Sequence, residues 1–560
     1  MDWAALVERS GRGWRAPALA AVVALLAGLP GLLALPPLDR DESRFAEASA
    51  QMLETGDFVA PRFQDTPRFK KPVGIYWLQA AAVRAVSHVE DRQIWPYRIP
   101  SLLGAMLAAA ACAWGAAAFA SPGRCLVAGG ILGASFLLSA EASIAATDGV
   151  LAGAVTLAMA ALGRIYLSGH CGPSAGRGTK ALFWAGLALS ILVKGPIGPM
   201  VVALTVVILC LWDRKARWLL PLGWGWGLLA IAALVGPWAM AVTVASDGAF
   251  WGASLGGDLA PKLLHGEESH GAPPGFYLLL APLMLFPATL LLPAGLVAGW
   301  RGRASPAIRF ALCWLVPAWL VFEAVPTKLI HYPLPVYGAL AWLMAAALAE
   351  PIGRRAAWIG AALMVLAALV FAVLGPIAVA RVGAGEGMGL AIAVALAYLA
   401  AGAAGAWLTL RGRALEGLLA AAALALVAHG LFLGVLAPQL RPLWLSNRAA
   451  RALAAAGASP AEGVIAGPVT VAGYEEPSLV FLLGSDTVLG DAADAAQAIA
   501  EGRPAIVEAR QTAPFQAALA TQHVAARRAG EGAGLDYSNN QHDVLQIFLP
   551  VQGPASEVKP

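Results

Sequence analysis

Charged residues are scarce in this chain, and their scarcity argues against several classes of protein. Of the 560 residues, 13% are charged and 59% are hydrophobic, and the mean hydropathy is +0.69. Soluble domains carry about 25% charged residues, so this chain has roughly half the charge that a water-facing surface needs. The net charge of +4 is small and is spread over many loops, which argues against a disordered or nucleic-acid-binding protein. The composition predicts a protein that crosses a membrane many times.

Cysteine is also rare, and no heptads, internal repeats or low-complexity tracts are evident. Four of the five cysteines lie in or beside apolar runs, and Cys171 lies in a loop that we expect in the cytoplasm. The sequence therefore predicts no disulfide framework. The apolar run at 16–36 is long enough to span a membrane, and we interpret it as a span rather than a cleaved signal.

Long apolar runs dominate the first 437 residues. A membrane helix needs about 20 apolar residues, and the runs predict a polytopic, mainly α protein with about thirteen transmembrane helices. The pair of runs around Lys194 is short. The predicted spans are 16–36, 99–120, 124–140, 149–167, 180–193, 196–212, 217–241, 275–299, 307–325, 330–349, 356–379, 387–410 and 415–437.

Basic residues give these spans an orientation, because short loops rich in Lys and Arg favour the cytoplasm. With an N-terminus bearing Arg9, Arg12 and Arg15 inside, every even-numbered span ends at a basic loop. We therefore divide the chain into a membrane body (1–437) and an external domain (438–560).

Two large loops of the body, 38–98 and 242–274, then lie outside. The tail at 438–560 alternates short β-rich runs with Ala-rich helical stretches, which predicts a small external α/β domain. Its expected strands lie at 463–472, 478–483, 504–508 and 543–549, with a helix at 491–500.

The first external loop combines charge with amphipathic patterning. Residues 38–56 predict a helix that begins at an Asp39 or Asp41 N-cap and stops at Gly56. A second helix is expected to start at Lys70-Lys71-Pro72, since proline suits a first helical turn. Asp41 is explained equally well as a helix cap or as a functional carboxylate, and the lysines as interfacial anchors or as ligands.

An ordered set of motifs resembles the polyprenyl-phosphate-dependent membrane glycosyltransferases. That family includes the lipid A 4-amino-4-deoxy-L-arabinose transferases and the protein O-mannosyltransferases, and the resemblance covers roughly the first 350 residues. It implies a GT-C membrane fold with external juxtamembrane helices. The motifs are Asp41-Glu42-x-Arg44-Phe45-Ala46-Glu47, Met52-Leu53-Glu54-x-Gly56-Asp57-Phe58, Pro61-Arg62, Phe69-x-Lys71-Pro72, Tyr76-Trp77, Ala146-Thr147-Asp148-Gly149, Val193-Lys194-Gly195-Pro196-Ile197-Gly198 and Thr327-Lys328-Leu329-x-His331-Tyr332-x-Leu334-Pro335.

The resemblance implies two catalytic carboxylates. Asp41 matches the family's essential acidic residue, which takes a proton from the acceptor hydroxyl or orients the acceptor for attack at the anomeric carbon. Asp148 matches a second acidic position facing the same cavity. Arg44 is expected to hold Asp41 through a charge-assisted hydrogen bond, and Glu42 to support the same segment.

The resemblance also implies a cationic site for the donor phosphate. A lipid phosphate is a stable leaving anion, so it needs cations more than a general acid. Lys71 matches the family's phosphate-binding lysine. Lys328 and Tyr332 resemble further phosphate ligands, and Lys262 lies where relatives place a basic contact. Lys194 is predicted either to join them or only to reach the membrane interface.

One departure from the family pattern concerns metal binding. The arabinose transferases commonly carry Glu where this chain has Lys70, and relatives hold a metal partly through that glutamate. Residues of the second large loop offer other candidate ligands, so a divalent metal remains open, and no metal or other cofactor is assigned. These candidates are His265, Glu267, Glu268 and His270.

Taken together, the resemblance and the predicted orientation imply an inverting glycosyltransferase of the bacterial inner membrane with its active site and C-terminal domain in the periplasm. The expected donor is a sugar on undecaprenyl phosphate, and the expected acceptor is lipid A or another glycolipid. A protein hydroxyl is the second acceptor class, and a lipid-linked sugar transporter or flippase is the alternative function. A transporter predicts ionisable residues near the bilayer midplane and internal repeats, whereas the candidate residues here lie at one end of the spans.

Overall fold

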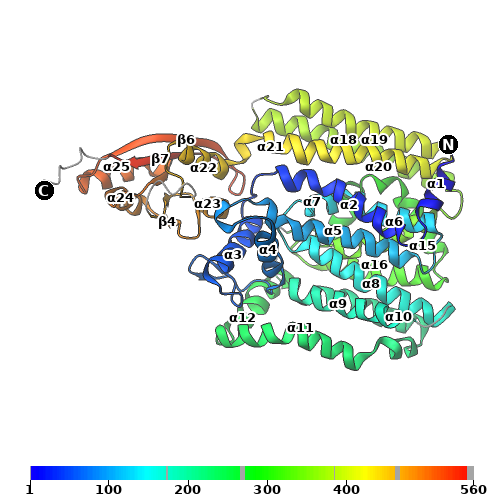
Figure 1. The fold of residues 1–560 in the computed structure, drawn as a ribbon. Helices are drawn as coiled ribbons and strands as arrows, with labels where there is room; N and C mark the ends of the chain where they lie inside the picture. The colour runs from blue at the N-terminus through cyan, green and yellow to red at the C-terminus, as the bar shows by residue number, and fades with distance from the viewer. Residues whose placement is uncertain (1, 172–174, 265–270, 384, 461–466, 552–560) are drawn as a thin grey trace.

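The computed structural model describes residues 2–171, 175–264, 271–383, 385–460 and 467–551. It consists of a bundle of roughly parallel and antiparallel helices with a small sheet at one end (Figure 1). The N-terminal helix α1 and the C-terminal sheet lie at opposite ends of the bundle (Figure 1). The predicted metal candidates at 265–270 lie outside the described residues.

The helical body follows the predicted apolar runs closely. Its helices are α1 (Trp3–Ser10), α2 (Arg15–Ala34), α3 (Asp41–Thr55), α4 (Gly74–Val86), α5 (Trp95–Ala116), α6 (Pro122–Ala134), α7 (Phe136–Glu141), α8 (Asp148–Cys171), α9 (Arg177–Lys194), α10 (Ile197–Asp213), α11 (Trp224–Ala245), α12 (Ala249–Trp251), α13 (Ala260–Leu264), α14 (Phe276–Met284), α15 (Leu292–Arg301), α16 (Pro306–Ala324), α17 (Tyr337–Ala347), α18 (Arg354–Val382), α19 (Met388–Leu410), α20 (Ala414–Leu431) and α21 (Ala437–Gln439).

Eight helices of the described chain are long and apolar enough to cross a membrane, by length and composition, or nine if the bent pair α14–α15 forms one span. That pair is bent by 119°. The remaining runs fold as shorter helices such as α10 and α17. The structure thus confirms a mainly helical, multi-span body, and the count of thirteen stays a prediction.

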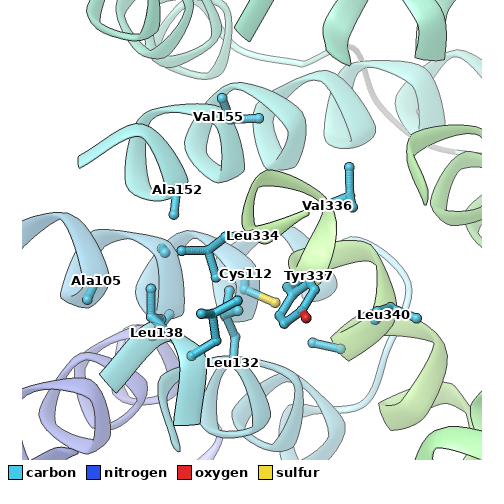
Figure 2. Close-up of a cluster of buried hydrophobic side chains, with 14 of the residues drawn as sticks. Ala105, Cys112, Leu132, Leu138, Ala152, Val155, Leu334, Val336, Tyr337 and Leu340 are labelled. Carbon is cyan, nitrogen blue, oxygen red and sulfur yellow. The ribbon is translucent and has the colours of Figure 1, made fainter. Parts of the chain in front are cut away.

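The core of the body forms where small residues let helices approach closely. Ala105 and Cys112 on α5 pack near Leu132 on α6, Ala152 on α8 and Tyr337 on α17 (Figure 2). All five are buried. Alanine and glycine at such contacts are typical of membrane helix packing, because there the close approach of backbones provides van der Waals contact.

The C-terminal region contains a five-stranded sheet in the order β4-β3-β5-β7-β6. Strand β3 pairs in parallel with β4 and β5, whereas β7 is antiparallel to both β5 and β6. In the described part of this region, four α-helices accompany the sheet. The elements are α22 (Leu445–Ala455), β3 (Thr470–Ala472), α23 (Pro477–Leu483), β4 (Val488–Gly490), α24 (Ala492–Ala500), β5 (Ala505–Glu508), α25 (Thr512–Thr521), β6 (Ala526–Asp536) and β7 (Gln541–Pro550).

Three local predictions were wrong. The helix expected to start at Lys70-Lys71-Pro72 begins at Gly74, so Pro72 lies before the helix and not in its first turn. Residues 478–483, predicted as a strand, form the helix α23, which packs its apolar side chains into the core beneath the sheet. The first loop helix α3 has Arg40 at its N-cap with no side-chain cap, so neither Asp39 nor Asp41 caps it. Gly56 ends α3 in the left-handed conformation as expected. A short hairpin of β1 (Arg62–Phe63) and β2 (Thr66–Pro67) also separates α3 from α4.

Candidate active site

Helices α3 and α4 lie at the end of the bundle that faces the C-terminal sheet (Figure 1). Two cavities adjoin there, and both are lined by residues that lead into α4. One, of about 380 Å³, is lined mainly by polar and charged side chains, including Asp41 and Asp148. The other, of about 450 Å³, is lined mainly by apolar side chains from α9, α10, α16 and the segment 250–259. The two cavities share a wall of charged residues and one tyrosine: Lys70, Lys71, Asp148, Lys194, Asp258, Lys262 and Tyr332.

Asp41 stands at the first position of α3 and faces the polar cavity. Its side chain is 73% exposed, and its carboxylate lies 3.7 Å from the guanidinium of Arg68. Arg68 is buried and also lies over the ring of Phe45. The prediction that Arg44 pairs with Asp41 was therefore wrong. Arg68 pairs with Asp41 instead, and Arg44 lines the same cavity.

Glu42 lines the same polar cavity as Asp41, but it is buried. Its carboxylate accepts two hydrogen bonds of 2.8 Å from Arg98 on α5, and another of 2.7 Å from the backbone N–H of Ala145. Both Glu42 and Arg98 are buried. A buried bidentate pair with further hydrogen bonds is rigid, so Glu42 fixes the start of α3 against α5 and the segment before α8.

Asp148 begins α8 and is surrounded by cations. The ammonium of Lys194 lies 2.5 Å from one carboxylate oxygen, and Nε2 of His331 lies 3.6 Å from the other. The second ring nitrogen of His331 lies 3.4 Å from Glu141. Burial alone would lower the pKa of His331, but the two carboxylates outweigh burial and raise its pKa. The imidazole of His331 thus lies between two carboxylates.

The ligand atoms of Glu141, Asp148 and His331 lie within 4.8 Å of one another, so these residues could hold a metal ion. Each ring nitrogen of His331 faces a different carboxylate, and Lys194 already neutralises Asp148. A metal would use only one imidazole nitrogen and would displace that lysine. The donor set therefore fits an ion-pair network better than a metal site.

The predicted phosphate ligands gather around a carboxylate that the sequence analysis did not single out. Asp258, in a π-helix at Gly252–Leu259, accepts hydrogen bonds of 2.5 Å from both Lys71 and Lys262. Burial alone would raise the pKa of Asp258, but the two lysines outweigh it and lower that pKa. Burial in turn lowers the pKa of Lys71 despite this partner. Asp258 thus holds two ammonium groups in the wall that the two cavities share.

Tyr332 and Lys194 complete the shared wall, with the Lys194 ammonium 5.4 Å from the tyrosine ring centre. Lys328, which was predicted to bind the donor phosphate, does not lie in this wall. Its ammonium donates to the backbone carbonyls of Glu323 and Val325, at 2.8 and 2.5 Å, and it is only 4% exposed. Lys328 is not among the described residues that line either cavity, so here it supports the chain turn after α16.

Comparisons with known proteins show which family and which fold the chain resembles. Residues 34–248 match the family model described as dolichyl-phosphate-mannose-protein mannosyltransferase. The undecaprenyl phosphate-alpha-4-amino-4-deoxy-L-arabinose arabinosyl transferase of Aeromonas salmonicida is 30% identical over 56% of this chain and 58% of that protein. The enzyme of the same name from Pseudomonas paraeruginosa is 30% identical over 61% of this chain and 64% of that protein. The chain therefore spans less than two thirds of the length of these relatives.

The structural match covers more of this chain than the sequence matches do. The crystal structure of ArnT from Cupriavidus metallidurans bound to undecaprenyl phosphate matches with a TM-score of 0.74 and 19% identity, covering 95% of this chain and 97% of that one. The chain resembles the polyprenyl-phosphate-dependent membrane glycosyltransferases. The resemblance predicted from the motifs is confirmed, and the helical body has the fold of ArnT.

Several side chains of this glycosyltransferase-like site were missed by sequence reasoning. Arg68, Glu141 and Asp258 fall outside the quoted motifs, although Asp258 precedes Lys262 by four residues, a spacing that brings side chains together on a helix. His331 stands inside a quoted motif but was given no role. Tyr537 reaches the polar cavity from the C-terminal region, and no local pattern could have placed it there.

Proposed function

We propose that this chain is an inverting glycosyltransferase that moves a sugar from undecaprenyl phosphate to a periplasmic acceptor, with lipid A or another glycolipid as the acceptor class. The main support for this proposal is that an apolar and a polar cavity share a wall rich in lysine. An apolar cavity suits a polyprenyl chain, a polar one suits sugar and acceptor, and the wall between them suits the phosphate.

The proposed reaction follows from these positions. The acceptor oxygen attacks the anomeric carbon and loses its proton to Asp41, while the bond between that carbon and the phosphate oxygen breaks. The bonding pair leaves with the lipid phosphate, whose charge Lys71 and Lys262 stabilise. Attack opposite the leaving phosphate inverts the anomeric centre. Asp258 must release the two lysines when the phosphate enters.

We further propose that the chain crosses a bacterial inner membrane thirteen times and that its N-terminus lies in the cytoplasm. Residues 438–560, which include the sheet, would then form a domain in the periplasm. The opposite placement of α1 and the sheet supports this orientation (Figure 1). A protein hydroxyl is the second acceptor class, favoured by the family model that matches residues 34–248.

The test compares lipid extracts by mass spectrometry. Cells lacking the gene are complemented with the wild type or with Asp41→Asn, and Asp65→Asn serves as control because that exposed carboxylate lies outside both cavities. We expect a sugar-sized mass on a glycolipid to disappear with the gene and to return with the wild type and the control. Full restoration by Asp41→Asn would contradict the proposed role of Asp41. A sugar found on protein instead would favour the second acceptor class.

A further inference from the structure

The turn between β6 and β7 reaches from the C-terminal sheet to the residues just before Asp41. The backbone N–H of Asp39 donates to the hydroxyl of Tyr537 at 2.7 Å. The guanidinium of Arg40 donates to the carbonyl of Ser538 at 3.0 Å. Tyr537 also lines the polar cavity that contains Asp41. The turn therefore contacts both the cavity and the chain that leads into α3.

Side chains of the same region hold Asp39 and Arg40 from a second direction. The hydroxyl of Ser478 on α23 donates to the carboxylate of Asp39. Ser478 is completely buried, and its hydroxyl oxygen lies 2.6 Å from the hydroxyl oxygen of Ser446 on α22, from which it can accept a hydrogen bond. Glu476 lies 4.0 Å from the guanidinium of Arg40. Both residues before Asp41 are thus fixed to buried parts of the C-terminal region.

The backbone at this point requires such support. Arg40 has φ 60° and ψ −108°, a conformation that residues with a Cβ rarely adopt. Strained backbone of this kind persists only where the surroundings hold it, and it is often found beside functional residues. The next residue is Asp41, and α3 begins there without a side-chain cap.

Hydrogen bonds within the turn also stabilise its conformation. The carboxylate of Asp536 accepts hydrogen bonds from the backbone N–H groups of Ser538 and Asn539, at 2.9 and 3.3 Å, and from the Asn539 side chain at 2.8 Å. Asn540 has a positive φ of 56°, which asparagine tolerates better than most residues. A turn held in this way presents Tyr537 in one orientation.

We propose that the β6–β7 turn is a positioning element of the active site, in which Tyr537 and Ser538 hold Asp39 and Arg40 so that Asp41 faces the acceptor. This inference rests on the role proposed for Asp41. It gives the C-terminal region a function in catalysis. Tyr537 is a positioning residue, since it acts on Asp41 through the backbone of Asp39.

The first test measures hydrogen exchange of the full-length protein in lipid nanodiscs and does not depend on any activity. Tyr537→Phe removes the hydroxyl and keeps the ring. We expect amide exchange of residues 38–44 to become about two- to tenfold faster, as for the loss of one hydrogen bond, while α4 stays unchanged. Thr512→Val is the matched control, because it removes one side-chain hydrogen bond to Gln546 elsewhere in the same region. Unchanged exchange at residues 38–44 in Tyr537→Phe would overturn the proposal.

The second test asks whether the effect passes through Asp41. In the complemented cells, Tyr537→Phe should lower the rate of glycolipid formation by about two- to tenfold, whereas binding of undecaprenyl phosphate to the purified protein should not change. Combined with Asp41→Asn, the same substitution should have no further effect, because residues that act through one another are not additive. Faster exchange with an unchanged rate, or an additive loss, would overturn the positioning role. If no glycosyl transfer occurs in any strain, the proposed function fails, and the exchange result still decides whether the turn holds residues 38–44.

Discussion

If the shared wall binds the donor phosphate as proposed, Asp258 competes with that phosphate for two lysines. It binds Lys71 and Lys262 at the same time, and neither lysine can fully serve a phosphate until this carboxylate moves. A carboxylate that competes with the ligand weakens binding but keeps the ammonium groups oriented. This arrangement is suited to a donor that must enter, react and leave as a lipid phosphate.

We predict that Asp258→Asn binds undecaprenyl phosphate more tightly, by about threefold to tenfold, because removing a nearby negative charge strengthens the attraction of the lysines for the phosphate. Lys71→Met should weaken the same binding by about tenfold or more. Titration of the purified protein with undecaprenyl phosphate measures both changes, with Asp65→Asn as control. Weaker binding by Asp258→Asn would mean that orienting the lysines matters more than the competing charge.

The raised pKa of Asp39 leads us to expect that the contact between the β6–β7 turn and the start of α3 depends on pH. Burial, and to a lesser extent the charges of Glu476 and Asp536, raises the pKa of Asp39 from its ordinary 3.8 to about 7, although the hydrogen bond from Ser478 opposes the shift. Tyr537 and Tyr474 are further titratable groups that interact with Asp39. The folded protein then retains a proton between about pH 4 and 7 that the unfolded chain releases.

It follows that stability falls as the pH rises through this window. We expect the wild type to lose more thermal stability between about pH 5 and pH 8 than Asp39→Asn, which cannot ionise. Melting curves of both proteins over this range provide the measurement. Parallel pH profiles for the two proteins would show that Asp39 does not titrate as its surroundings imply.

At the scale of elements, the close packing of α5 against α8 determines where Asp148 lies. A Cβ added at Gly104 on α5 would come within 2.6 Å of Val150 Cα on α8, whereas a Cβ at Gly130 on α6 would meet no atom within 4 Å. The backbones of α5 and α8 are therefore in direct contact only two residues beyond the start of α8. Small residues at such crossings permit this approach.

We predict that Gly104→Ala destabilises the protein by about 1–3 kcal/mol, the usual cost of overpacking, and reduces activity by displacing Asp148. Gly130→Ala on a neighbouring helix is the matched control and should be neutral. Thermal unfolding in detergent checks both substitutions. Equal stability of the two variants would mean that α5 and α8 separate at little cost.

Elements also show how far the sequence could predict the fold. Apolar runs located the helices of the body, because hydrophobicity over about 20 residues is a strong local signal. Residues 478–483 were misassigned, since a short apolar run is compatible with a strand or a buried helix. Arg68 and Asp258 were missed as partners of Asp41 and Lys71 because each pair is separated along the chain and only tertiary packing brings it together. The roles of the quoted site residues remain predictions.

For the whole molecule, the arrangement of the two ends is the largest-scale consequence of the fold. Helix α1 lies at one end of the bundle, and the sheet lies at the other, next to α3 and α4 (Figure 1). Both cavities are lined by residues that lead into α4, so they lie near the end with the sheet. Because basic loops favour the cytoplasm, we expect the cavities to open on the external face. A donor and an acceptor would then meet in one leaflet.

Substituted cysteines test this orientation directly. In a Cys171→Ser, Cys210→Ser background, the remaining cysteines Cys112, Cys125 and Cys313 are buried. A membrane-impermeant thiol reagent applied to intact spheroplasts should label Ala493→Cys, on an exposed site of α24, but not Trp14→Cys, which is 77% exposed at the other end. Permeabilised cells should show labelling of both, which verifies that each thiol is reactive. Labelling of Trp14→Cys alone in intact spheroplasts would invert the orientation, and with it the compartment in which the acceptor must be sought, because both cavities lie on the side of the sheet.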